Sequence, residues 1–143
     1  MPRDVPREVL DVLQAVPLFS GCSAKELRTI AGLGTDLSVK EGTVLTEEGA
    51  PGSELVIVLA GEASCSIKGQ EVAVFERGDF FGEMSLLDSG PRSATVVAKT
   101  DMDVLILEGR EFKRLVIESP AIAWKMLVAM AGRLRRADEL MRF

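Results

Sequence analysis

Residues 81–96 read Phe81-Gly82-Glu83-Met84-Ser85-Leu86-Leu87, Asp88-Ser89-Gly90, Pro91-Arg92-Ser93-Ala94-Thr95-Val96. The first half of this stretch, together with Phe80, lacks the apolar–polar alternation of a strand and is too short for an ordinary helix. It therefore predicts a single helical turn, starting at Gly82 and inserted between strands. An interruption of this kind indicates that these residues serve a function and are not needed to build the fold.

The residues of this turn suit a ligand that combines an anion with a hydroxyl. A helical turn directs unpaired backbone N–H groups outward, and Gly82 lets a ligand approach closely. The turn at 89–91 folds Arg92 back toward the same point, where its guanidinium matches the oxygens of a phosphate. Glu83 fits beside an anion if it accepts a hydrogen bond from a hydroxyl of the same ligand. An isolated Glu and Arg more commonly form a surface ion pair, but the coincidence of glycine, helical turn and Pro-Arg favours a phosphate fused to a ribose that keeps its 2′-OH.

Outward from this stretch, residues 35–108 have the pattern of a β domain. Glycines typical of turns recur about every ten residues, at Gly42, Gly52, Gly61, Gly69, Gly78 and Gly90. Between them lie short runs rich in Val, Ile and Leu, at Thr43–Thr46, Leu55–Ala60, Ala63–Ile67, Glu71–Phe75, Ala94–Ala98 and Met102–Leu107. This spacing predicts an all-β sandwich, barrel or roll.

Helical patterns lie on both sides of the β region. Residues 5–15 carry an apolar stripe, which Pro17 ends. Ser23 is a predicted N-cap, and Glu26 three residues later completes a capping box for a second helix that glycines close at 32 and 34.

After Gly109 the helical period returns, and Pro120 marks the start of a long helix over 121–143. Its apolar residues follow a heptad-like seam, at Ala123, Leu127, Met130, Leu134, Ala137 and Met141. The stripe can pack on the β region, pair with a second copy, or do both. We predict a homodimer through this helix.

Composition narrows the functional classes. The chain has 143 residues, 47% of them apolar, so it predicts one folded domain over 1–143, with N-terminal helices at 1–34, a β region at 35–108 and C-terminal helices at 109–143. It has no histidine and only two cysteines, which argues against a metal or haem centre and against an enzyme. A net charge of −5 argues against direct DNA or membrane-surface binding. The absence of a long apolar run and of a signal-peptide pattern predicts a cytoplasmic protein.

The stretch at 81–95 resembles the phosphate-binding cassette of cyclic nucleotide-binding domains, as in bacterial catabolite activators and the regulatory subunits of cAMP-dependent protein kinase. The resemblance covers nearly the whole chain. It implies an α+β, mainly β fold: an antiparallel, jelly-roll-like β-roll with N-terminal helices, a short phosphate-binding helix and a long C-terminal helix.

The resemblance also implies roles for individual residues. Glu83 would bind the ribose 2′-OH and Arg92 the cyclic phosphate. Backbone amides of Gly82, Met84 and Ser85 would contact phosphate or sugar, and Ser93 would add a hydroxyl. Cys65 and Val72 would lie beneath the purine. The ligand would be cAMP, with cGMP as the alternative, and no cofactor or metal is implied.

The chain departs from the activators in two places. Their long helix carries a Thr–Ser pair over the adenine, whereas Ala137-Asp138 stand here, so that Arg136 becomes a candidate to stack on the purine instead. The activators also continue into a helix-turn-helix domain beyond this helix. We therefore expect a freestanding sensor that signals through a hinge near Gly109 and the C-terminal helix, with a regulatory fragment of a longer transcription regulator, channel or enzyme as the alternative. Its downstream partner is not indicated by the sequence.

Overall fold

The computed structural model describes residues 5–83, 85–88 and 90–141, and it divides into two compact units. One, over 33–113, contains the strands and is called the β unit here. The other, over 5–32 and 114–141, contains most of the helices and is called the helical unit.

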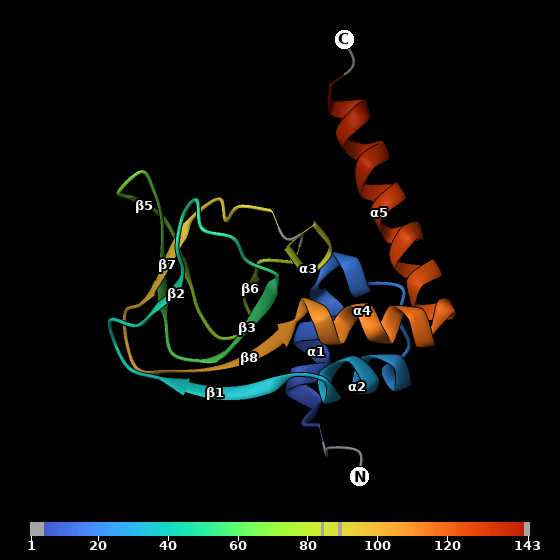
Figure 1. The fold of residues 1–143 in the computed structure, drawn as a ribbon, viewed down its shortest axis with the longest axis horizontal. Coiled ribbons are helices and arrows are strands. Elements are labelled where there is room, and N and C mark those ends of the chain that lie inside the picture. The colour runs from blue at the N-terminus through green and yellow to red at the C-terminus, as the bar shows by residue number, and fades with distance from the viewer. Residues whose placement is uncertain (1–4, 84, 89, 142–143) are drawn as a thin grey trace. The chain divides into compact units, whose positions relative to one another are not determined.

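The β unit consists of two four-stranded antiparallel sheets (Figure 1). The first sheet has the order β1 (Thr35–Val39), β8 (Met102–Glu108), β3 (Glu54–Ala60), β6 (Phe80–Phe81). The second has the order β2 (Val44–Thr46), β7 (Thr95–Ala98), β4 (Ala63–Ile67), β5 (Gln70–Phe75). Helical segments precede and follow these strands in the chain. The predicted fold class, an antiparallel β-roll with helices at both ends of the sequence, is confirmed.

The core of the β unit lies between the two sheets. Buried side chains of both sheets form one cluster, Val56, Val58, Ala63, Cys65, Val96, Ala98, Met102 and Val104. Complete burial of a Val or Leu side chain stabilises a fold by roughly 1.5–3 kcal/mol. The alternation of these small and branched side chains along β3, β4, β7 and β8 therefore holds the sheets face to face.

The β4–β5 connection is a two-residue turn, because Ile67 pairs with Gln70 across it. Lys68 and Gly69 both have positive φ, 52° and 81°. Two consecutive residues with positive φ match the right-handed twist of a hairpin. Lys68 is the only described non-glycine residue with this conformation.

The structure differs from the sequence prediction around the helical turn. Phe80 and Phe81 form a short strand that pairs with Ile57 and Val56 of β3, and helix α3 extends only over Ser85–Asp88. Gly82 has a φ of 86°, so the helical turn does not begin there. The prediction was wrong at this point because pairing with a distant strand overrides the weak local signal of two residues. The strand β1 was not among the predicted runs, and its residues are mostly exposed.

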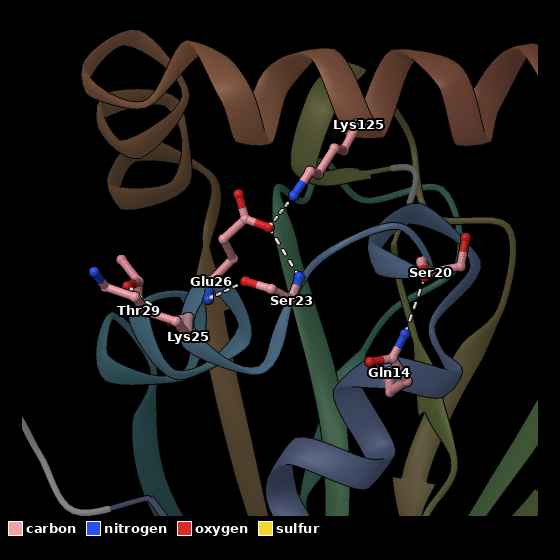
Figure 2. Close-up of polar contacts among 7 residues, drawn as sticks. All are labelled: Gln14, Ser20, Ser23, Lys25, Glu26, Thr29 and Lys125. Carbon is pink, nitrogen blue, oxygen red and sulfur yellow. Dashed lines mark hydrogen bonds and ion pairs between the residues drawn. The ribbon is translucent and has the colours of Figure 1, made fainter.

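The helical unit contains α1 (Arg7–Ala15), the 3₁₀ turn η1 (Pro17–Phe19), α2 (Ala24–Gly32) and α5 (Pro120–Leu140), while α4 (Gly109–Glu118) spans both units. The predicted capping box is confirmed: Glu26 N donates to Ser23 Oγ at 3.2 Å, and Ser23 N donates to Glu26 Oε1 at 2.8 Å. Figure 2 shows that the same carboxylate accepts a bond from Lys125 Nζ of α5, at 2.5 Å. Lys125 and Ser23 lower the pKa of Glu26.

Helix α5 buries one side and exposes another. Ile122 and Met126 are buried, whereas Leu127, Leu134 and Met141 of the predicted seam are 58%, 73% and 75% exposed. These seam side chains are therefore not buried against the other helices of the helical unit. Among the described residues, no single helix is long and apolar enough to cross a lipid bilayer.

Candidate functional site

A cavity of about 450 Å³ opens in the β unit, within the range of roughly 300–1,000 Å³ typical of small-molecule sites. Polar side chains contribute one part of its lining: Thr46, Glu83, Ser85, Asp88, Arg92 and Ser93. Apolar side chains contribute another: Cys65, Phe75, Phe81, Ala94 and Val96. The cavity thus offers both charged groups and an apolar surface to one ligand.

The guanidinium of Arg92 is held closely by backbone. Its Nη1 donates to the carbonyl oxygen of Glu54 at 3.0 Å. A Cβ added to Gly82 would lie 2.6 Å from Nη1, and one added to Gly52 would lie 2.6 Å from Cζ. Arg92 therefore occupies space that exists only because residues 52 and 82 lack side chains.

The backbone of Arg92 is also tied in place. Arg92 N donates to Ala50 O, and Gly49 N donates to Arg92 O, both at 2.9 Å. An isolated antiparallel bridge joins Pro51 to Pro91 beside them. The loop at 47–52 therefore positions Arg92 through both its main chain and its side chain.

Glu83 lines the same cavity and lies two residues before the start of α3. Its side chain is partly buried, and the Oε2 atom is shielded from solvent. A buried carboxylate in a cavity that also contains an arginine can accept a hydrogen bond from a ligand hydroxyl while the arginine binds an anion.

The remaining cassette residues lie close by. Ser85 and Ser93 both line the cavity, but Ser85 N already donates to Gly82 O, at 3.1 Å, where the chain enters α3. The predicted contact of Met84 lies outside the described residues.

Cys65 and Val72 differ in their surroundings. Cys65 is 8% exposed and lines the cavity, and burial raises the pKa of its thiol, so it behaves as a small apolar group. Val72 is the extra residue of a β-bulge between the pairs Cys65–Ala73 and Ser66–Glu71, and it is 57% exposed. Its place beneath a purine stays a prediction.

Arg136 belongs to α5 of the helical unit, where it is exposed. Its role as a purine lid also stays a prediction. No cluster of three or more potential metal ligands occurs among the residues that the structure describes.

The family described as the cyclic nucleotide-binding domain matches residues 36–119, which is more than half of the chain. The chain belongs to the cyclic nucleotide-binding domain family. This confirms the resemblance seen in residues 81–95.

Individual relatives agree with the family assignment. The chain is 43% identical to a cAMP-dependent protein kinase regulatory subunit of Aspergillus fumigatus over 106 residues, which are 73% of this chain and 26% of that protein. It therefore spans about a quarter of the length of this curated relative.

Two solved structures are similar to the chain. The N-terminal domain of a transcriptional regulator from Streptomyces coelicolor A3(2) has a TM-score of 0.85 and 29% identity, covering 93% of this chain and 96% of that one. The regulatory domain of Toxoplasma gondii PKA, crystallised with cAMP, has a TM-score of 0.69 and 31% identity, covering 80% of this chain and 46% of that one.

Sequence reasoning missed two features of this cyclic nucleotide-binding domain. Gly52 was interpreted only as a turn residue, although it makes room for Arg92. Phe75 and Phe81 were not singled out, although their rings stack in the cavity wall with centroids 5.0 Å apart. The Gly49-Ala50-Pro51-Gly52 loop indicates a turn, but no local signal shows that an arginine 40 residues later packs against it.

Proposed function

We propose that the chain is a cyclic nucleotide sensor, with cAMP as the preferred ligand and cGMP as the alternative. One observation carries the proposal: the guanidinium of Arg92, seated against Gly52 and Gly82, lines the same cavity as the partly buried carboxylate of Glu83. The relative crystallised with cAMP supports the choice of ligand.

In the proposed complex, Arg92 binds the cyclic phosphate and Glu83 accepts a hydrogen bond from the ribose 2′-OH. Amides of Gly82, Met84 and Ser85 and the hydroxyl of Ser93 add contacts to phosphate and sugar. The Ser85 amide donates to Gly82 O where the chain enters α3, so its contact with ligand requires this bond to rearrange.

The base would lie against the apolar part of the cavity, on Cys65 and the stacked Phe75–Phe81 pair, with Val72 beside it and Arg136 as a lid. Flat aromatic bases stack favourably on such surfaces. No catalytic group is assigned, because the proposed role is binding and release.

Output is proposed to pass through the C-terminal helix. Ligand binding shifts a pre-existing equilibrium, by no more than its difference in affinity for the two states. The exposed seam residues Leu127, Leu134 and Met141 support a homodimer through α5, since large exposed apolar patches mark interaction sites. We place this sensor in the cytoplasm, without direct contact to DNA or membrane.

The alternative is a regulatory module of a longer transcription regulator, channel or enzyme. The partial coverage of the kinase regulatory subunit and the likeness to a transcriptional regulator's N-terminal domain support it. An immunoblot of cells that express the gene from its own locus measures the mass of the natural product and separates the two alternatives.

Calorimetry with cAMP, cGMP and linear 5′-AMP tests the function. We expect about one cAMP per chain and far weaker binding of 5′-AMP, whose phosphate is not fused to the ribose. Arg92→Ala should weaken cAMP binding by roughly 2–4 kcal/mol, about 30- to 1,000-fold, with the fold intact. Arg77→Ala, which removes an exposed arginine of the same unit away from the proposed hinge, is the control. Equal affinity for cAMP and 5′-AMP, or full binding by Arg92→Ala, would contradict the proposal.

A further inference from the structure

The tip of the β4–β5 hairpin is held by few contacts of its own sheet. β5 is an edge strand, and the last pair between β4 and β7 is Ser66–Thr95. The bulge at Val72 interrupts the β4–β5 ladder beside Cys65. Bulges bend a strand locally, and only the pairs Ser66–Glu71 and Ile67–Gln70 join β4 to β5 beyond this one, so a contact from outside the sheet adds to the order of the tip.

Glu48 supplies such a contact. Its Oε1 accepts a hydrogen bond from Lys68 N, at 2.8 Å, across 20 residues of chain. Lys68 is the first residue of the two-residue turn, and the hairpin ladder uses the pair Ile67–Gln70 instead. The carboxylate thus satisfies a backbone donor at the residue with the left-handed φ of 52°.

The same segment is bound to the cassette on its other side. Glu48 N donates to Thr95 Oγ1 at 2.9 Å. One residue further, Gly49 N donates to Arg92 O, also at 2.9 Å. Glu48 therefore joins two walls of one cavity: the hairpin that carries Cys65 and the segment that carries Arg92.

We propose that Glu48 is a positioning residue for the nucleotide, which sets the hairpin wall against the base while Arg92 binds the phosphate. The inference rests on the proposed function, since it needs a ligand with both parts. Glu48 is not among the residues that line the cavity. Its side chain acts on the base alone, because Arg92 is held by main-chain bonds and by Gly52 and Glu54, independently of the Glu48 carboxylate.

Charge and hydrogen bonding make opposite predictions for Glu48. Removing a negative charge near an anionic ligand strengthens binding, whereas removing the hydrogen-bond acceptor loosens the wall. Glu48→Gln removes the charge and keeps an acceptor oxygen, and Glu48→Ala removes both. Glu47→Ala, at the exposed neighbouring residue, removes the same charge without the Lys68 bond and is the matched control.

The experiment compares cAMP with ribose 3′,5′-cyclic phosphate, which lacks the base, by titration calorimetry. We expect Glu48→Ala to raise the Kd for cAMP about 3- to 10-fold, because it removes one hydrogen bond to a charged, partly exposed group. The Kd for the base-free ligand should stay unchanged. Glu48→Gln and Glu47→Ala should bind cAMP as the parent does or slightly more tightly. Hydrogen exchange at the Lys68 amide should accelerate in Glu48→Ala only.

Three results would overturn the inference: equal losses for both ligands in Glu48→Ala, tighter cAMP binding in both Glu48 variants, or unchanged exchange at Lys68. The proposed function fails in a different way, because then the parent itself binds no cyclic nucleotide. In that case the exchange measurement still tests the Glu48–Lys68 contact without ligand.

Discussion

Gly52→Ala tests how the position of the Arg92 side chain affects ligand binding without disturbing the rest of the fold. Gly52 has a φ outside the left-handed region, so alanine fits its backbone without strain. The new Cβ would meet the Arg92 side chain, closest to Nε, and would lie 2.6 Å from Cζ and 2.8 Å from Nη2. Because this side chain is flexible, the clash is relieved by moving the guanidinium rather than the backbone.

The size of the effect follows from this displacement. To restore ordinary van der Waals contact, the guanidinium must move by more than about 1 Å. Its N–H···O bonds are effective only between roughly 2.7 and 3.2 Å, a window about 0.5 Å wide, so a shift of this size breaks at least one of them. Loss of one charge-assisted bond to phosphate corresponds to roughly 1.5–3 kcal/mol, or about a 10- to 150-fold higher Kd for cAMP. The free energy of unfolding without ligand should change by less than about 1 kcal/mol, because glycine-to-alanine replacement also restricts the unfolded chain.

A double-mutant cycle measures this coupling by calorimetry and denaturant unfolding. In the Arg92→Ala background the added methyl group meets no guanidinium, so Gly52→Ala should then leave cAMP affinity unchanged. Gly32→Ala, where a Cβ has nothing within 4 Å, is the control for the substitution itself. An equal loss of affinity in both backgrounds, or parental affinity in the single variant, would refute the reasoning.

Three further predictions concern other parts of the molecule. Glu83→Ala should weaken cAMP strongly but 2′-deoxy-cAMP much less, and equal losses in calorimetry would mean that Glu83 does not hold the hydroxyl. Leu134→Glu should convert a dimeric parent into monomers in light scattering, because it places an unpaired charge at the seam; a monomeric parent at micromolar concentration would contradict the dimer. The Lys125 ion pair and the Ser23 amide lower the pKa of Glu26, so its ionised form stabilises the fold above the unfolded-state pKa of about 4.3, and this stability is lost as the pH falls through the lower folded-state pKa. As the pH is lowered from about 5, the stability of Glu26→Gln should therefore fall less than that of the parent. Thermal unfolding at steps of about one pH unit measures this. If the stability of both proteins falls in parallel with pH, the contact does not contribute.

Much of the fold was predictable because its signals are local. The capping box of α2 needs only Ser23 and Glu26 three residues apart, and it forms as predicted. The runs at 55–60, 63–67 and 102–107 match β3, β4 and β8 to within a residue, since apolar content and flanking turns act over a few positions. The cassette residues were found in the same way, as an interruption of a regular pattern.

The sequence alone could not show which distant segments meet. Phe80–Phe81 became a strand because β3 was available to pair with it, and β1 because β8 was. Strand pairing depends on the partner's hydrogen bonds and the shared core, which no window of neighbouring residues contains.

The candidate site also combines local sequence signals with long-range contacts. From residue types and spacing, the sequence predicts a phosphate- and sugar-binding pattern at Gly82, Glu83 and Arg92. Only the tertiary structure decided how Arg92 is held, against Gly52 and the Glu54 carbonyl, and that Glu48 reaches the hairpin tip at Lys68. These contacts join residues 20 to 40 positions apart, so their geometry exists only after both sheets have packed and brought the loop at 47–52 beside the cassette.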